Sequence, residues 1–318
     1  MQALTLLETH VEDLFTDNLN SVIEQDANLI QAIDNIMLES TRSQVTLLQD
    51  ASWHIIKSGG KRVRPRMLLL SYLALGGTDL KTAMDVAAGI ELVHTASVVH
   101  DDINDHGVVR RGVPSVNAKW GRTFALLTGD FLFTKVYEIT AQYPLVSPIF
   151  ADATIKLVEG ETLQAYAVKN KQFDMKTYYN IIGLKTAVLF GAATKLGAML
   201  AGASDSVVQT LGDFGYKIGM AFQIFDDLLD LTGDTVQLGK TAGLDVEQGK
   251  GLSQVAIDSP DPMVAIKSQM MNASTIELGQ KMAQQFVDDA IGLLDDLPDS
   301  LARTKLIEIA HTVANRSH

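Results

Sequence analysis

The sequence contains no cysteine among its 318 residues. This absence excludes disulfide bridges, thiolate metal sites and cysteine nucleophiles. It also suits a reducing compartment, and the acidic, amphipathic N-terminus lacks the basic start and unbroken apolar stretch of a signal peptide. We therefore expect a cytoplasmic protein.

Basic residues are scarce as well. Lys and Arg total 26 against 38 Asp and Glu, which gives a formal net charge of −12 with neutral histidines. Proteins that bind nucleic acids need a basic face to replace the counterions of the phosphate backbone. We therefore expect no nucleic-acid partner, although a few clustered cations would still bind a small anion.

Proline and aromatic residues are also few, with 7 Pro and 6% aromatics. Long stretches are instead rich in good helix formers, and their apolar residues recur at spacings of three and four. This pattern predicts helices over 4–19, 45–56, 67–75, 83–99, 124–139, 149–167, 178–199, 207–231 and 280–294. Because no repeat or long linker divides the chain, we expect a single all-α domain over residues 1–318.

The most apolar window of the sequence runs from residue 181 to residue 203. It contains Lys185 and Lys195 and is rich in Gly and Ala. Two lysines near the middle of a bilayer would be costly. The window therefore predicts a buried helix rather than a membrane span.

Three aspartates, Asp101, Asp102 and Asp105, stand at the end of a strongly apolar predicted helix. Their i, i+3 and i, i+4 spacing places the three carboxylates on one side of that helix. A solvated acidic helix end is the simpler interpretation of one such DDxxD motif. The functional interpretation is a site for Mg²⁺, which prefers oxygen ligands and shares its coordination with substrate phosphates.

The same motif occurs a second time, with Asp226, Asp227 and Asp230 at the end of another apolar predicted helix. Two apolar helices that both end in DDxxD are hard to explain as chance solvated ends. We therefore expect the two helices to face each other across a cavity, with both sets of carboxylates at its mouth.

Cations accompany these carboxylates. The segment 57–66 has several basic residues around two glycines, and Arg110 and Arg111 follow the first aspartate motif. Solubility and helix-end charges are the simpler explanations. In the functional interpretation the glycines let the backbone approach a diphosphate that Lys61 and Arg64 hold.

Four further residues have both a structural and a functional interpretation. His94 lies two helical turns before Asp101 and is either a core histidine or a ligand-binding group. Lys185 and Thr186 interrupt an apolar helix, where a buried lysine needs an anion such as a substrate phosphate. Lys240 is the weakest candidate because an exposed lysine is common.

These motifs occur in a characteristic order: GGKRVRP, ELVHTASVVHDD, DDINDHGVVRRG, LLTGDFLF, EGETLQ, GLKTA, FQIFDDLLD and LGKTAG. In this respect nearly the whole chain resembles the trans (E) polyprenyl diphosphate synthases. The resemblance implies an isoprenoid-synthase-like bundle of about ten or more helices around a central cavity. It also implies a Mg²⁺-dependent transferase that condenses isopentenyl diphosphate head-to-tail with an allylic diphosphate.

The resemblance assigns roles to individual residues. It implies that two or three Mg²⁺ ions bind the six aspartates Asp101, Asp102, Asp105, Asp226, Asp227 and Asp230. Contacts to the allylic diphosphate are implied for Arg110, Lys185, Gln223 and Lys240, with Thr186 beside them. Contacts to isopentenyl diphosphate are implied for Lys61, Arg64, His94 and Arg111.

Product length depends, in the resembling family, on the positions that Ala96 and Ser97 occupy. Short-chain members often have an aromatic ring there, whereas both residues are small in this sequence. The resemblance therefore implies a product of C20 or longer, with C30 to C40 expected. The alternative is that Ala96 and Ser97 are merely small where two helices cross.

Two alternatives to a catalytic chain of this family are a class I terpene cyclase and a non-catalytic subunit. A class I terpene cyclase normally replaces the second DDxxD with a motif that mixes Asn, Ser or Thr with Glu. A non-catalytic subunit would be expected to lose the aspartates. The chain is therefore expected to be catalytic, either as a homodimer or with a small regulatory subunit. Beyond Gly249 the sequence departs from the family pattern, which leaves the role of Lys250 open.

Overall fold

The computed structural model describes residues 26–170, 174–232 and 273–314, without the side chains of 26, 27, 230–232 and 273–275. Its helices are α3 (Asp26–Ser40), α4 (Thr46–Lys57), α5 (Val63–Ala74), α6 (Leu80–Asn104), α7 (Val116–Trp120), α8 (Arg122–Thr140), α9 (Ser147–Asn170), α10 (Met175–Ile182), α11 (Val188–Leu200), α12 (Asp205–Thr232), α16 (Ala273–Gly292) and α17 (Leu301–Ala314). A π-helical segment, η1 (Gly183–Ala187), joins α10 to α11. The strands β1 (Val109–Arg110) and β2 (Val113–Pro114) form a small antiparallel hairpin.

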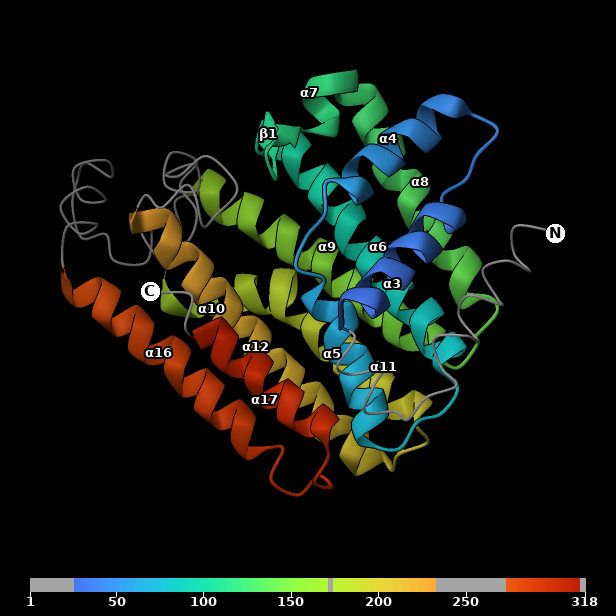
Figure 1. Ribbon diagram of the computed structural model, residues 1–318. Coiled ribbons are helices and arrows are strands. Elements are labelled where there is room, and N and C mark those ends of the chain that lie inside the picture. Colours follow the sequence, from blue (N-terminus) through green and yellow to red (C-terminus); the bar gives the residue numbers. More distant parts are fainter. Residues whose placement is uncertain (1–25, 171–173, 233–272, 315–318) are drawn as a thin grey trace.

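The predicted all-α class is confirmed in the described residues (Figure 1). The apolar periodicity did not predict α3, α7 or α17. The predicted helix over 4–19 lies outside the described residues, and the single-domain organisation stays a prediction. One hydrophobic core contains buried residues from α3 through to α17.

Helix α6 runs through this core. Asp79 caps its N-terminus by accepting a hydrogen bond from the Thr82 amide at 3.1 Å. Its side chains are buried on nearly every face between Leu80 and Ile103, as expected of a helix that is apolar all round. The helix packs against α3, α5, α8 and α11, so its polar residues stand out against an apolar background.

The helical stretch Met175–Leu200 is long and apolar enough to cross a membrane by length and composition, with a mean hydropathy of 1.3. However, 78% of that window is buried inside the structure. The prediction of a buried helix is therefore confirmed, with one difference in its geometry: the stretch contains η1 and is not α-helical throughout.

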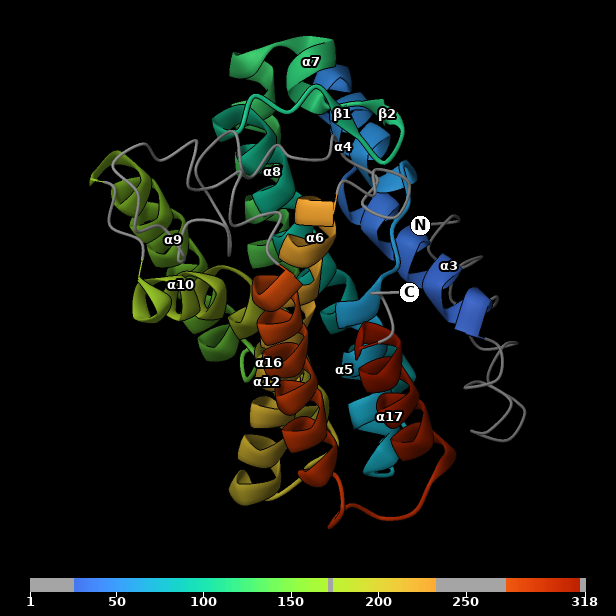
Figure 2. The ribbon, with the colours of Figure 1, turned by 90° about the vertical axis from the view of Figure 1, so that its left-hand side faces the viewer.

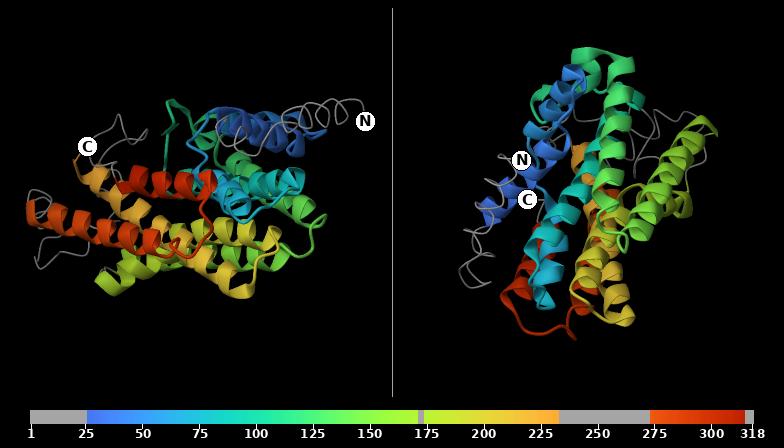
Figure 3. Two further views of the ribbon diagram at one scale, coloured as in Figure 1. Left: turned by 60° about the horizontal axis from the view of Figure 1, so that its bottom comes forward. Right: turned by 90° about the vertical axis from the view of Figure 1, so that its right-hand side faces the viewer.

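The long helices α6 and α12 run in the same direction, so their carboxyl ends lie at the same end of the molecule (Figures 1 and 2). Both ends carry a DDxxD motif. Helices α9 and α10 lie together on the side of the bundle away from α3 (Figures 2 and 3). The segment η1 follows α10 and packs against α9 and α12. This places it near the end of the bundle at which α6 and α12 carry their aspartate motifs.

Candidate active site

The first aspartate motif forms the carboxyl end of α6. The Asp105 amide donates to the Asp101 carbonyl at 2.7 Å and ends the helix. A helix carboxyl end carries a partial negative charge. The carboxylates at this end therefore add to an already negative potential, and the site strongly favours cations.

Asp102, the middle residue of this motif, is held by the protein. Its side chain is 2% exposed, and Arg110 Nη2 lies 2.5 Å from its Oδ1 atom. Burial raises the pKa of Asp102 even though Arg110 acts to lower it. Gly107 permits this geometry, since a Cβ atom there would lie 2.6 Å from Asp102 Oδ1. Arg110 itself is placed by strand β1, where it pairs with Val113.

Lys185 lies in η1 and faces two acidic side chains. Its Nζ atom is 2.6 Å from Glu161 Oε1 on α9 and 3.7 Å from Asp101 Oδ1. These carboxylates raise the pKa of Lys185 against the opposing effect of burial. Burial and the charge of Asp101 raise the pKa of Glu161 to about 7. The anion that this lysine was expected to need is thus supplied within the protein by Asp101 and Glu161, and the lysine side chain is 21% exposed.

The second aspartate motif lies at the end of α12, and its middle residue is again held by neighbours. Asp227 is 5% exposed. Its Oδ2 atom accepts a hydrogen bond from the Tyr178 hydroxyl at 2.7 Å, and its Oδ1 atom accepts one from Gln223 Nε2 at 3.0 Å. The Thr186 hydroxyl in turn donates to Gln223 Oε1 at 2.8 Å. The side chain of Asp230 is outside the described residues.

Lys185 and Thr186 connect the two motifs. Lys185 faces Asp101 of the first motif, and its neighbour Thr186 binds the glutamine that holds Asp227 of the second. π-Helical segments are rare and occur frequently at functional sites. Segment η1 thus links the two aspartate motifs, and a shared cavity with both motifs at its mouth stays a prediction.

Among the side chains that the structure describes, which do not include Asp230, the carboxylates are not assembled into a ready-made metal site. Among the residues that the structure describes, no three His, Asp or Glu side chains come close enough together to hold a metal ion. The engagement of Asp102 and Asp227 by protein groups accounts for part of this. The remaining donors are hard oxygens at two helix ends, which suits Mg²⁺ that keeps several waters and also binds substrate phosphates.

A second group of residues is basic and surrounds His94. Burial and the charges of Arg64 and Arg111 hold the pKa of His94 well below its usual range, so the imidazole is neutral. The Arg64 guanidinium carbon lies 4.3 Å from the centre of the Phe190 ring, in a cation–π contact. Arg111 donates to the Gly59 carbonyl, which ties the hairpin to the loop before α5. Arg64 and Arg111 thus both act electrostatically on His94, and Arg111 also contacts the loop before α5.

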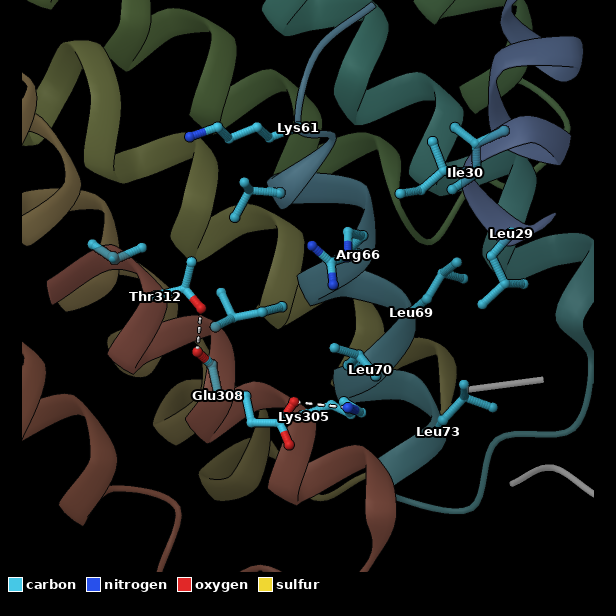
Figure 4. A pocket seen from close by; sticks show the side chains of 14 residues that line it. Leu29, Ile30, Lys61, Arg66, Leu69, Leu70, Leu73, Lys305, Glu308 and Thr312 are labelled. Carbon is cyan, nitrogen blue, oxygen red and sulfur yellow. Dashed lines mark hydrogen bonds and ion pairs between the residues drawn. The ribbon is translucent and has the colours of Figure 1, made fainter. Parts of the chain in front are cut away.

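Lys61, the fourth residue assigned to isopentenyl diphosphate, is exposed and lies at the rim of a separate cavity of about 460 Å³ between α3, α5 and α17. Figure 4 shows Lys61 and Arg66 on one side of this cavity, with Leu69 and Leu73 further along α5. The structure thus places Lys61 in the loop before α5, which Arg111 contacts, with its side chain at the rim of this separate cavity.

The two positions assigned to product length lie inside the bundle. Ala96 is fully buried and Ser97 is 8% exposed, with the Ser97 hydroxyl donating to the His94 carbonyl. Two turns earlier on the same face of α6 is Gly89. A Cβ atom at Gly89 would lie 3.1 Å from the Phe150 ring, so this aromatic ring covers α6 below Ala96.

Several residues of the site were not predicted from the sequence. Glu161 lies within the EGETLQ motif but had no assigned role, and Tyr178 had no signal at all. Both contribute contacts across separate elements, which a linear pattern does not reveal. Lys240 and Lys250, by contrast, lie outside the described residues.

The chain matches the family model of the polyprenyl synthetases over residues 45–293. It is 36% identical to heptaprenyl diphosphate synthase component 2 of Geobacillus stearothermophilus, over 91% of this chain and 96% of that protein. The structure matches a polyprenyl synthase from Caulobacter crescentus in complex with calcium and isoprenyl diphosphate, with a TM-score of 0.86 and 28% identity over 95% and 98% of the two chains. It also matches a geranylgeranyl pyrophosphate synthetase from Pyrococcus horikoshii, with a TM-score of 0.83 and 32% identity over 96% and 99%.

These similarities extend over nearly the whole chain and agree with the paired aspartate motifs at the ends of α6 and α12. They also exclude the terpene cyclase alternative. The chain therefore belongs to the polyprenyl synthetase family and is a chain-elongating trans-polyprenyl diphosphate synthase.

Proposed function

We propose that this enzyme adds isopentenyl diphosphate units to an allylic diphosphate, with Mg²⁺, until the product reaches C20 or longer, with C30 to C40 expected. The observation that carries the proposal is the link through η1, in which Lys185 faces one aspartate motif and Thr186 binds the residue that holds the other. An allylic diphosphate at this point would contact both sides of the site at once.

Two or three Mg²⁺ ions would be held by the outer aspartates Asp101, Asp105 and Asp226, together with Asp230. Bound Mg²⁺ would neutralise the charge that develops on the departing diphosphate. Asp102 and Asp227 support this set from within the protein, since their oxygens already bind Arg110, Tyr178 and Gln223.

The reaction begins when the bond between the allylic carbon and the diphosphate oxygen breaks. Lys185 and Arg110 stabilise the charge of the departing diphosphate, and the apolar interior excludes water from the carbocation. The double bond of isopentenyl diphosphate then forms the new carbon–carbon bond. Loss of a proton to the released diphosphate restores an allylic diphosphate, so no protein general base is required.

We assign the two diphosphates to different sides of the site. The allylic diphosphate contacts Arg110, Lys185, Thr186, Gln223 and Lys240. Isopentenyl diphosphate contacts Lys61, Arg64, His94 and Arg111. The neutral state of His94 supports this assignment because a neutral imidazole donates a hydrogen bond to phosphate while the arginines supply the charge.

The product length is proposed from the small residues Ala96 and Ser97, which leave room for a growing isoprenoid tail along α6. The related proteins make both heptaprenyl and geranylgeranyl products, so family membership alone does not fix the length. The ring of Phe150 lies against Gly89, two turns below Ala96 on the same face of α6. We propose that it limits the length of the tail.

We further propose that the chain is catalytic by itself, as a cytoplasmic homodimer. The Geobacillus relative is one component of its enzyme, and a small regulatory subunit is the alternative. The decisive experiment is incubation of the purified chain with isopentenyl diphosphate, Mg²⁺ and allylic primers of several lengths, followed by sizing of the products.

Products of C20 or longer from the chain alone, abolished by a chelator, are the expected result. Turnover that stops at C15 would contradict the proposed length. Absence of turnover with every primer, when a heptaprenyl synthase assayed alongside is active, would contradict autonomous catalysis and favour the two-component alternative.

A further inference from the structure

Arg62 lies between two residues assigned to isopentenyl diphosphate, but its side chain points into the protein. Its side chain is only 1% exposed. Nε donates to Asp34 Oδ1 at 2.8 Å, Nη1 donates to Glu91 Oε1 at 3.0 Å, and Nη2 donates to the Ile56 carbonyl at 2.8 Å. All three guanidinium nitrogens are thus used to bind α3, α6 and α4.

The backbone of the same loop has an unusual conformation. Arg62 has φ +46°, in the left-handed region, and so does Gly59 with φ +81°. A residue with a side chain occupies this region only when its surroundings hold it there. Arg111 binds the loop from the opposite side, at the Gly59 carbonyl. Two arginines therefore hold the segment 58–62: Arg62 through its own side chain, and Arg111 through the Gly59 carbonyl.

The contact to Glu91 couples this loop to His94. Glu91 precedes His94 by three residues on α6, so it lies one turn away and on the same side of the helix. Glu91 and Asp34 also neutralise the positive charge of Arg62. This matters because the charges of Arg64 and Arg111 already act on the His94 imidazole. The ion pairs of Arg62 thereby set the position of the loop relative to the histidine and reduce repulsion within the cluster.

We propose that Arg62 is a positioning residue: through Asp34 and Glu91 it holds the loop 58–62, and with it the start of α5, in the conformation that presents Arg64 to the diphosphate of isopentenyl diphosphate. This role rests on the proposed assignment of that diphosphate. Arg62 does not touch the substrate.

Two variants test this role. Arg62→Lys keeps the positive charge but loses the guanidinium group, whose three nitrogens bind α3, α4 and α6. Asp34→Asn removes the negative charge that pairs with Arg62, at a side chain that is 30% exposed. Each variant should raise the KM for isopentenyl diphosphate about tenfold and leave the KM for the allylic substrate within about twofold. Asp34→Glu should restore most of the affinity for isopentenyl diphosphate.

Arg303→Lys is the matched control. Arg303 likewise donates to a backbone carbonyl, that of Leu294 at 2.8 Å, and pairs with Asp299 at 2.5 Å and Asp295 at 3.5 Å. It lies at the start of α17, outside the proposed site. Arg303→Lys should lower the temperature of thermal unfolding, as the test variants should, because it loses similar contacts. It should change neither the KM for isopentenyl diphosphate nor the KM for the allylic substrate.

Limited trypsin digestion supplies a readout that does not depend on turnover. Cleavage after Lys61 and Arg62 should be faster in Asp34→Asn than in the wild type and unchanged in Arg303→Lys. Equal increases in both KM values, or an unchanged KM for isopentenyl diphosphate in both test variants, would overturn the role of Arg62. Failure of the wild type to incorporate isopentenyl diphosphate would instead overturn the substrate assignment.

Discussion

At the scale of single residues, the two DDxxD motifs are not sets of equivalent carboxylates. The middle aspartates Asp102 and Asp227 are buried and bound by protein side chains, whereas Asp101 is 21% exposed and faces Lys185. Each middle residue is held by a group from another element, Arg110 of β1 or Tyr178 of α10. The motifs thus combine partly exposed carboxylates, which we propose to bind Mg²⁺, with buried aspartates that other elements hold.

We predict that Tyr178→Phe weakens catalysis without destroying the fold. The substitution removes the hydrogen bond from the Tyr178 hydroxyl to Asp227 and keeps that from Gln223, so this carboxylate is held less firmly. Removal of such a supporting contact typically costs about 10- to 100-fold in metal affinity or activity. The Mg²⁺ concentration for half-maximal activity should rise, as measured by titration of initial rates.

Tyr179→Phe is the control for this prediction, because it removes the adjacent hydroxyl from a ring that packs against Phe286. It should leave the Mg²⁺ titration unchanged. The same Mg²⁺ dependence in Tyr178→Phe and the wild type would show that Asp227 does not need this hydrogen bond.

At the scale of secondary-structure elements, α6 organises the site. This one helix carries Glu91, which binds Arg62 of the loop before α5, and His94, which we propose to contact a diphosphate. It also carries Ala96, at the proposed tail channel, and Asp101, at the proposed Mg²⁺ site. The helical spacing therefore sets the distances between these groups. The hairpin β1–β2 then brings Arg110 and Arg111 back towards the end of this helix. The spacing of residues on α6 therefore determines where the reacting groups lie relative to the growing chain.

We predict that Ala96→Tyr shortens the product towards C15 and leaves turnover intact. Ala96 is fully buried, and an aromatic ring there would occupy the space proposed for the tail. Phe150→Ala should act in the opposite direction and lengthen the product, because it removes the ring that covers Gly89. Sizing of products by chromatography distinguishes these effects.

Phe150→Ala is also expected to lower the free energy of unfolding by about 3–5 kcal/mol, as for other large core truncations. Its product length should therefore be compared at a temperature where both proteins are folded. A product distribution unchanged by Ala96→Tyr would place the length-determining channel elsewhere.

At the scale of the whole molecule, apolar side chains are exposed along α8 and α9. They are Phe124, Leu126, Leu127, Tyr137, Ile155, Val158 and Tyr166, each at least 43% exposed, with Leu145 at 81% in the connection between the helices. Large apolar areas on a protein surface mark interaction sites. Both helices also supply functional contacts, since α9 carries Glu161 and α8 packs along α6.

We predict that the chain forms a homodimer through this surface. Leu127→Glu should convert the dimer to a monomer in light-scattering measurements, because a carboxylate would be buried at the interface. Leu278→Glu, at a similarly exposed position on α16, is the control and should remain dimeric. A monomeric wild type would contradict the homodimer.

The sequence alone determined the helical class, the two aspartate motifs and most of the basic residues, because helix periodicity and residue chemistry are local properties. It did not separate Asp102 from Asp101, or Arg62 from its neighbours Lys61 and Arg64. Those distinctions depend on contacts between residues far apart in the chain, such as Tyr178 with Asp227 and Arg62 with Asp34 and Glu91. Only the packing of α3, α6, α10 and α12 decides which polar groups are buried and paired and which remain available to a ligand.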